Sequence, residues 1–387
     1  MARRAVISSG VLKGYLLEEV VASLIRNAGY RLLTRPEDDP HDLSLMSNGL
    51  QVRGRGGFHQ ADVLGELTWA PAFGNPIRLF IEAKWRGQGR ARVGIPDARH
   101  AVGILQDVNQ VLVTVQARSA GAAPSLTNED VTNSGRGFCY SYRYALCSTS
   151  GFSPGAQAYA LAHQVALLDL SHQEYDELRS AIDTVGDDLH NYIESTERAA
   201  SASAAPRGRL VRRIRATLRR ELWGLSQADA EGGLLPILQP LLEATWNIGE
   251  LFVGVSATGF VILLKADRRE QMIRHMQAPA DPWTSIHYQL DENGASNWRL
   301  TVSSADGSIE SCQLFFVLPD AMLRVLDEQA ESSRRRAAAL NLKTQHFSRI
   351  TVYRITDEKS LICSLRLDEG SLVEARRRLE GRTQGRQ

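Results

Sequence analysis

The sequence predicts an α/β domain followed by an α+β domain in which antiparallel strands dominate. Its length of 387 residues allows two to three domains of about 100–200 residues each. Helix-like and strand-like periodicities alternate through residues 1–172, which predicts a mixed central sheet flanked by helices. Strand-like segments separated by turn signals fill residues 250–387, and residues 173–249 between them have the pattern of a helical, basic linker.

The composition is typical of a globular protein with sizeable cores. Apolar residues make up 43% of the chain, charged residues 23%, and the net charge of +1 provides no overall basic field. Four widely spaced cysteines show no CxxC pair, which argues against a zinc module or disulfide scaffold and predicts a reducing compartment. The N-terminal residues lack the apolar run of a signal peptide, and no segment approaches the ~20 apolar residues of a membrane span. We therefore expect a cytoplasmic protein without a membrane partner.

The elements of the first domain follow from local patterns. Residues 13–33 place apolar side chains at helical spacing, and Asn27 and Gly29 supply the stop, which predicts a helix. Two short strands are expected around the glycine-rich turn 54–57, with a third in "PIRLFIEAKW". The remaining segments predict, in order, a helix over 94–110, a strand over 140–150, a helix over 153–164 and a strand over 165–170.

The second half begins with an acidic helix-like segment and continues with a strongly basic one, "RGRLVRRIRATLRRELW". Arg212, Arg213 and Arg215 of that segment are candidates for contacts with a nucleic-acid backbone. An alternative is that the basic helix pairs with the acidic stretch "DDLHNYIESTE". The strands after residue 250 contain no phosphate loop, metal-ligand spacing or nucleophile constellation, so we expect recognition, sensing or assembly there, by analogy of arrangement alone.

The stretch "LFIEAKWR" contains the first candidate for chemistry. Residues two apart in a strand face the same side, so Glu82 and Lys84 should project together. Alone, this pattern also fits a solvated ion pair. Asp62 in the preceding strand adds a second carboxylate, and two neighbouring carboxylates favour a hard cation such as Mg²⁺. A lysine beside that cation supplies the remaining part needed for phosphodiester hydrolysis.

Four segments in order resemble the PD-(D/E)xK nuclease superfamily, which has the restriction-endonuclease-like fold, and more narrowly the Mrr-like type IV restriction endonucleases. They are "LLEEVVASLIRNAGY", the glycine-rich "GRGGFHQADVLGE", "FIEAKW" and "CSTSGFSPGAQAYALAHQVALLDL". The resemblance covers roughly residues 10–172. Ala61 stands where the motif has proline, and Glu82 stands where many Mrr-like domains have glutamine.

The resemblance implies roles for the motif residues. Asp62, Glu82 and the Ala83 carbonyl would bind Mg²⁺, with Mn²⁺ able to substitute, and Lys84 would position or activate the attacking water. The helix acid would hold a metal-bound water or a second ion. Family spacing favours Glu18 for this role, and the adjacent Glu19 is the alternative.

Residues flanking the motif could contact nucleic acid. Arg53, Arg55 and Arg86 suit bidentate phosphate contacts, although loop arginines are also common on plain surfaces. His59 and Gln60 lie next to Asp62, and His59 could act on phosphate or simply bond the backbone of its turn.

The resemblance implies an endonuclease that cuts DNA, in bacterial defence against phage or foreign DNA. The same fold serves repair and recombination nucleases and enzymes that cut RNA, so these remain alternatives. A non-catalytic nucleic-acid-binding or assembly protein is the alternative outside the enzymes. Cutting two strands is simplest for a homo-oligomer, and the C-terminal domain could receive a partner or trigger.

Overall fold

The computed structural model describes residues 7–46, 49–68, 75–87, 89, 91–109, 140–199, 207–223, 234–248, 251–258, 261–290, 296–316, 318, 322–323, 332–355, 360–368, 370, 373 and 377. The helices of this part are α1 (Ser9–Asn27), η1 (Pro36–Asp38), α2 (Ile95–Asn109), α4 (Pro154–Ala162), η2 (Gln173–Tyr175), α5 (Asp176–Ala199), α6 (Arg207–Trp223), α7 (Leu235–Asn247), α8 (Arg269–Gln277) and α10 (Ser332–Phe347). The strands are β1 (Tyr30–Leu32), β2 (Leu43–Met46), β3 (Gly49–Arg53), β4 (Phe58–Gln60), β5 (Val63–Leu67), β6 (Ile77–Lys84), β7 (Ser141–Ser148), β8 (Ala166–Asp169), β9 (Leu251–Ser256), β10 (Val261–Ala266), β11 (Trp283–Leu290), β12 (Ser296–Ser303), β13 (Cys312–Phe316), β14 (Arg349–Ile355) and β15 (Ser360–Leu367).

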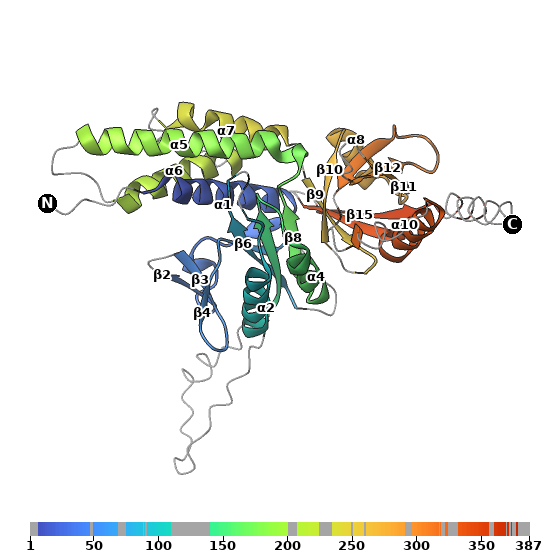
Figure 1. Ribbon diagram of the computed structural model, residues 1–387, viewed down its shortest axis with the longest axis horizontal. Helices are drawn as coiled ribbons and strands as arrows, with labels where there is room; N and C mark the ends of the chain where they lie inside the picture. The colour runs from blue at the N-terminus through green and yellow to red at the C-terminus, as the bar shows by residue number, and fades with distance from the viewer. Residues whose placement is uncertain are drawn as a thin grey trace, which may run out of the picture.

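A five-stranded mixed sheet forms the centre of the N-terminal unit, in the order β1-β5-β6-β7-β8. The pairs β1–β5 and β5–β6 are antiparallel, whereas β6–β7 and β7–β8 are parallel. Strand β6 is therefore central, and the chain passes through α2 and α4 to return to each parallel neighbour. A separate antiparallel sheet, β2-β3-β4, lies beside it (Figure 1).

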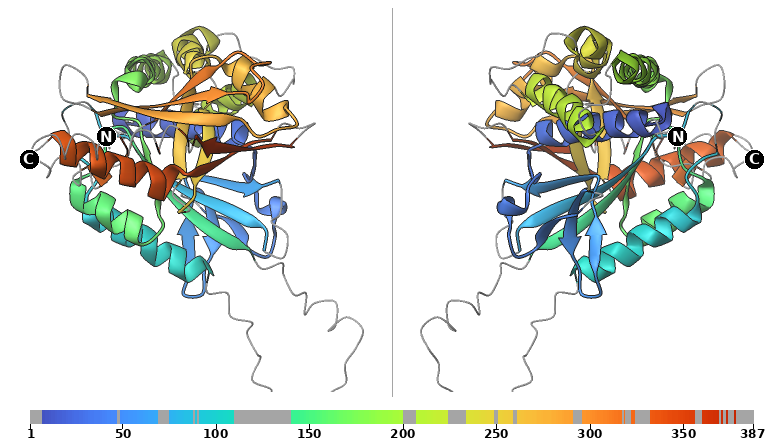
Figure 2. Two further views of the ribbon diagram at one scale, coloured as in Figure 1. Left: turned by 90° about the vertical axis from the view of Figure 1, so that its right-hand side faces the viewer. Right: turned by 90° about the vertical axis from the view of Figure 1, so that its left-hand side faces the viewer.

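Helices cover both faces of the five-stranded sheet, as Figures 1 and 2 show. Successive side chains of β6 point alternately to the helices on the two faces of the sheet. Ile81 belongs to the core shared with α1, while its neighbour Phe80 belongs to the core shared with α2 and α4. A strand buried on both faces is expected to be a nearly continuous apolar run, which explains the sequence "LFI" in the middle of β6.

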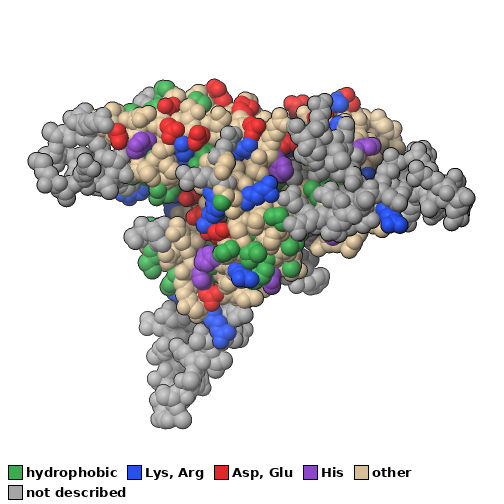
Figure 3. All heavy atoms as spheres, in the orientation of Figure 1, with side chains coloured by type: hydrophobic (Ala, Val, Ile, Leu, Met, Phe, Trp, Pro, Cys, Tyr) green, Lys and Arg blue, Asp and Glu red, His purple; other side chains and the backbone are tan. Residues whose placement is uncertain are grey.

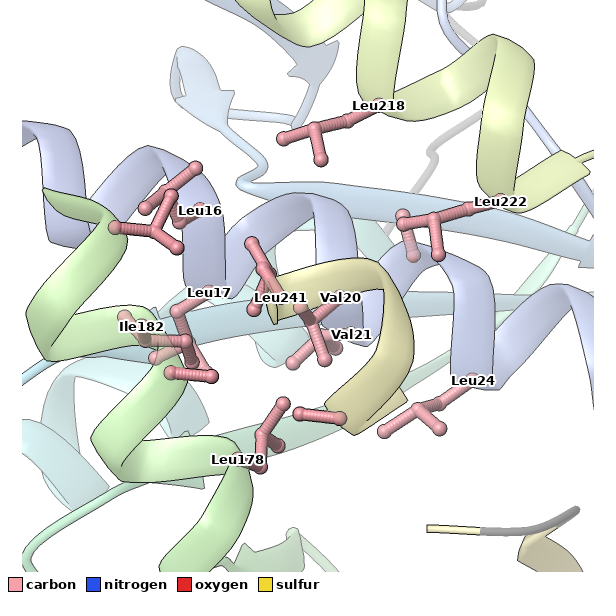
Figure 4. Packing of buried hydrophobic residues seen from close by; sticks show 14 of the residues in the cluster. Leu16, Leu17, Val20, Val21, Leu24, Leu178, Ile182, Leu218, Leu222 and Leu241 are labelled. Carbon is pink, nitrogen blue, oxygen red and sulfur yellow. The ribbon is translucent and has the colours of Figure 1, made fainter. Parts of the chain in front are cut away.

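Helix α1 is almost surrounded by other elements. Its sheet-facing and helix-facing residues, such as Leu17 and Val20, are fully buried. Figure 4 shows Leu178 and Ile182 of α5, Leu218 and Leu222 of α6, and Leu241 of α7 converging on this helix. Burying one such leucine contributes roughly 1.5–3 kcal/mol. The helices of segment 173–249 therefore pack into the core of the N-terminal unit, although the sequence pattern suggested a linker.

Arg78 anchors the start of β6 from a fully buried position. Its guanidinium donates to Asp39 at 2.6 Å, Glu66 at 3.0 Å and the Tyr142 hydroxyl at 3.0 Å. The ring of Tyr140 lies 3.2 Å from the guanidinium carbon. Because a buried charge is tolerated only when it is paired, this network fixes β6 against its neighbours on the face that also presents Glu82.

The strands of the C-terminal unit close into a seven-stranded barrel, in the order β10-β13-β12-β11-β15-β14-β9. The antiparallel pairing expected from the sequence is present in this barrel, and one parallel pair, β11–β15, completes it. Trp298, Phe316 and Phe347 pack in its core with ring centroids 5.4–6.3 Å apart. Closure leaves no open sheet edge along the barrel. The sequence analysis did not anticipate that closure.

The barrel adjoins the N-terminal unit through apolar side chains. Val253 of β9 and Leu263 of β10 face Val21 of α1 and Leu168 of β8 across a narrow apolar space. The proposed boundary between segments 173–249 and 250–387 lies at residues 249–250, outside the described residues. No helix in the described part of the chain is both long and apolar enough to cross a membrane.

Candidate active site at the end of strand β6

Glu82 and Lys84 close the carboxyl end of β6 on one side of the strand. Their side chains form an ion pair, which confirms the shared side that the two-residue spacing predicted. The Tyr144 hydroxyl of β7 donates to Glu82 Oε2 at 2.9 Å. The parallel register sets Phe80 opposite Tyr144, and the two rings stack with centroids 4.9 Å apart. Glu82 is therefore oriented from two sides.

Asp62 approaches this pair from the residue just before the neighbouring strand, β5. It immediately precedes β5, whose first residue Val63 pairs with Ile81. The backbone N–H of Ala83 donates to Asp62 Oδ2 at 2.8 Å, so the carboxylate lies against the β6 segment between Glu82 and Lys84. Burial raises the pKa of Asp62, and the negative charge of Glu82 adds to this effect, while the Ala83 hydrogen bond and Lys84 oppose it.

Lys84 is held as a cation in this setting. Burial alone would lower its pKa, but the hydrogen bond and charge of Glu82, together with the charges of Asp97 and Asp62, outweigh burial and raise the pKa. The lysine side chain is 32% exposed, and that of Glu82 is 17% exposed. The ammonium group of Lys84 is thus partly exposed to solvent and lies near the carboxylates of Glu82 and Asp62.

Helix α1 contributes Glu18 and Glu19, and the structure separates their environments. Glu19 is 1% exposed and is clamped by two arginines of α6: Arg215 Nε at 2.5 Å, and Arg219 Nε and Nη2, both at 2.8 Å. Glu18 receives a single contact, from Arg215 Nη2 at 2.9 Å. Helix α1 packs against both α6 and β6 (Figure 1).

Glu18 interacts electrostatically with other charged residues of the site. Burial raises its pKa to about 7; Arg215 opposes this rise, and the charges of Asp62 and Glu19 reinforce it. Repulsion between Glu18 and Asp62 requires the two carboxylates to lie near each other. Both carboxylate oxygens of Glu19 instead accept hydrogen bonds from Arg215 and Arg219. Of the two alternatives for the helix acid, Glu18 is the one whose pKa is affected by the charge of Asp62.

His59 contacts a different partner from the one its position suggests. Its Nε2 lies 2.7 Å from Asp107 Oδ2 on α2, and the Gly56 N–H donates to the other oxygen of Asp107 at 2.8 Å. The glycine-rich turn is thereby fastened to α2, and Gly54 is needed there because a Cβ would lie 2.0 Å from Asp107 Oδ2. His59 therefore has a structural role, in which it pairs with Asp107. The sequence-based alternative was also structural, but it gave His59 a bond to the backbone of its own turn.

The flanking arginines fall into two groups. Arg86 is occupied by the loop that follows it, donating to the carbonyls of Ala91 at 2.9 Å and Arg92 at 3.2 Å. Arg53 is exposed, and its guanidinium lies over the ring of Phe58 at 5.6 Å from the centroid. Arg55 makes a backbone bond to Asp107, and Gln60 is exposed at the end of β4.

The basic helix α6 also divides into two kinds of arginine. Arg212 and Arg213 are exposed, as expected of residues that could meet a polyanion. Arg215, grouped with them from the sequence, is instead turned inward onto Glu18 and Glu19. Its acidic partners come from α1 and not from the acidic stretch of α5, whose acidic side chains lie along the surface in Figure 3.

The donor set fits a hard divalent cation. Asp62 and Glu82 supply carboxylate oxygens, the Ala83 carbonyl is adjacent, and the repulsion among the three acids is the kind that a bound cation relieves. No group of three or more His, Cys, Asp and Glu side chains within the described ranges is arranged to hold a metal. Two carboxylates and a backbone carbonyl would be a different ligand set, which water would complete.

The sequence did not reveal Tyr144, which contacts Glu82 in the site, or Arg219, which holds Glu19 outside the site. Tyr144 sits in an apolar strand pattern and carries no motif, so its bond to Glu82 depends on the β6–β7 register. Arg219 was one of many arginines in a basic helix. Its spacing of four residues from Arg215 is the only local signal that both face one side.

Comparisons with known proteins supply little beyond this geometry. No known family matches the sequence, and no curated protein matches it. A crystal structure titled as a protein of unknown function, AF1548, matches with a TM-score of 0.25 and 16% identity, over 55% of this chain and 99% of that one.

Proposed function

We propose that this protein is a divalent-metal-dependent nuclease of the PD-(D/E)xK kind that hydrolyses phosphodiester bonds at the end of β6. One observation carries the proposal. The hydrogen bond from Ala83 N–H to Asp62 brings the carboxylate that precedes β5 to the segment of β6 that carries the Glu82–Lys84 ion pair. Such a set has no evident value for packing, because each member is partly buried and two carry the same charge.

Asp62 and Glu82 would hold Mg²⁺ or Mn²⁺, with the Ala83 carbonyl as a third ligand. When bound, the cation would lower the pKa of a coordinated water and neutralise charge on the phosphate. The chain's own residues do the positioning. Tyr144 fixes the rotamer of Glu82, and the Ala83 N–H fixes Asp62.

Lys84 would donate hydrogen bonds from its ammonium group to the attacking water or to a phosphate oxygen. Its ion pair with Glu82 holds it on the side of the strand where that water must lie. Glu18 would accept a hydrogen bond from the same water or from a second one, since one of its carboxylate oxygens has no partner among the described residues. A preorganised set of donors and acceptors is the usual source of rate enhancement in phosphoryl transfer.

DNA is the proposed substrate, with defence against phage or foreign DNA in the bacterial cytoplasm as the proposed setting. Exposed Arg212, Arg213 and Arg53 supply cationic side chains for its backbone. The barrel would supply recognition, sensing or assembly, and cutting both strands would suit a homo-oligomer. RNA cleavage or a repair role would use the same chemistry, and a protein that binds nucleic acid without cutting is the alternative outside the enzymes.

Incubating the protein with supercoiled plasmid and Mg²⁺ tests the proposal. The wild type should nick the plasmid, and Asp62→Ala should abolish nicking. Asp183→Ala is a matched control, because Asp183 is a 57% exposed carboxylate on α5 outside the site. Equal nicking by the wild type and Asp62→Ala would refute the site assignment. Metal-dependent cutting of RNA but not DNA would favour the RNA alternative.

A further inference from the structure

Arg215 occupies an unusual position between two acids of one helix. Its Nε contacts Glu19 at 2.5 Å and its Nη2 contacts Glu18 at 2.9 Å. Glu19 is already held by both nitrogens that Arg219 presents, at 2.8 Å each. Neutralising Glu19 therefore does not require Arg215, whose second contact directs the guanidinium toward Glu18.

Two of the three guanidinium nitrogens of Arg215 are engaged in these contacts. The third, Nη1, has no hydrogen-bond partner among the described residues. The guanidinium is close enough to Asp62 for its positive charge to lower the pKa of that carboxyl group. Arginine presents its donors in a fixed fork, so anchoring two nitrogens on acids also fixes the direction of the third.

The charges around the site suggest a role for the positive charge of Arg215. With all three carboxyl groups ionised, Glu18, Asp62 and Glu82 would contribute −3, while Lys84 and Arg215 contribute +2, which leaves −1. A divalent cation would change the sum to +1, and a phosphodiester would bring it to zero. The attack of water adds negative charge to the phosphoryl group, and the donors that respond to that charge must already be in place.

We propose that Arg215 is a catalytic residue, which donates a hydrogen bond from Nη1 to a non-bridging oxygen of the scissile phosphodiester. This inference rests on the proposed nuclease function. In the reaction, the water oxygen forms a bond to phosphorus and gives up one proton, one phosphorus–oxygen ester bond breaks, and the leaving oxygen takes up one proton. Arg215 stays protonated throughout and stabilises the charge that builds on the phosphoryl oxygens.

The site would thus be completed by a helix that follows the N-terminal domain in the sequence. Arg215 lies 196 residues after Glu19, beyond the segment that resembles the nuclease family. Its neighbours Ile214, Leu218 and Leu222 bury α6 against the core that contains α1, which fixes the helix beside the site. Phosphate recognition by α6 would then differ between the inward Arg215 and the exposed Arg212 and Arg213.

Single-turnover cleavage of a labelled DNA duplex in Mg²⁺ tests this role, with Arg215→Lys compared with Arg219→Lys. Both variants keep a positive charge near the buried Glu19, so each should fold. Losing one preorganised donor costs about 10²–10³-fold in rate, so Arg215→Lys should fall toward that range. Arg219→Lys should stay within about threefold of the wild type. Duplex affinity without metal should not change in Arg215→Lys.

Two results would overturn the role of Arg215: cleavage by Arg215→Lys at the wild-type rate, or an equal loss of rate in both variants. A second readout separates this inference from the proposed function. Calorimetric titration with inorganic phosphate in the presence of Mg²⁺ should show binding to the wild type and Arg219→Lys, and weaker binding to Arg215→Lys. That result supports Arg215 as a phosphate donor even if no duplex is cut. Equal phosphate binding by all three proteins, or none by any, would contradict it.

Discussion

Asp62 accepts a 2.8 Å hydrogen bond from the backbone N–H of Ala83, which places the carboxylate that precedes β5 against the segment of β6 that carries Glu82 and Lys84. The two strands are antiparallel neighbours, and Val63, directly after Asp62, pairs with Ile81. The contact therefore follows from the register of the central sheet. A slip of two residues would move Asp62 away from both Glu82 and Lys84.

Tyr144→Phe should weaken the hold on the metal without unfolding the protein. The substitution removes the 2.9 Å donor to Glu82 Oε2 and keeps the ring stacked on Phe80. Net loss of one hydrogen bond to a charged group costs about 1.5–3 kcal/mol at most. We expect a higher Mg²⁺ concentration at half-maximal cleavage and nearly unchanged cleavage at saturating Mg²⁺. The check is a Mg²⁺ titration, and an unchanged midpoint would show that Tyr144 does not orient Glu82.

Glu18→Gln should change how the stability of the metal-free protein depends on pH. The folded state raises the pKa of Glu18 from its ordinary 4.5 to about 7, so folding favours the protonated form. Stability from this group is therefore fully present below pH 4.5 and is lost as the pH rises toward 7. At about 1.36 kcal/mol per pKa unit, the loss is up to roughly 3 kcal/mol.

Urea unfolding at pH 5 and pH 8 measures this effect. The wild type should be less stable at pH 8, and Glu18→Gln should show a smaller difference between the two pH values. Asp62, whose pKa is also raised, contributes in the same direction, so part of the slope should remain in the variant. If Glu18→Gln lost as much stability between pH 5 and pH 8 as the wild type, Glu18 would not be a source of the pH dependence.

Gly54→Ala should loosen the glycine-rich turn from α2. The added Cβ would lie 2.0 Å from Asp107 Oδ2, which must then leave His59 and Gly56. We expect a destabilisation of about 1–3 kcal/mol from the broken hydrogen bonds. Gly57→Ala is the matched control, because its Cβ would meet nothing within 4 Å. Chemical denaturation compares the two, and equal midpoints would contradict the close approach at Gly54.

One feature of the candidate site could be predicted from the sequence, because it depends on local periodicity. The shared side of Glu82 and Lys84 follows from the two-residue repeat of a strand. The difference between Glu18 and Glu19 did not follow, since it depends on their arginine partners on α6. These contacts span about two hundred residues, and no local pattern encodes them.

The same division applies to the fold. Alternating helix and strand patterns predict an α/β unit, and turn signals predict antiparallel strands after residue 250. Closure of the barrel depends on the pairing of β9 with β14 and of β11 with β15. Each of these pairs joins segments about 80–100 residues apart, so their partners are chosen by tertiary packing and not by local sequence.

The most direct test of the central claim is the single-turnover rate at which Lys84→Met cleaves a DNA duplex at saturating Mg²⁺. This variant keeps Asp62 and Glu82, so it should still bind the metal, and it lacks the ammonium group at the mouth of the site. The proposed nuclease predicts a wild type that cuts and a Lys84→Met rate at least about 10²-fold lower. A Lys84→Met protein that cuts as fast as the wild type would contradict an active site at the end of β6.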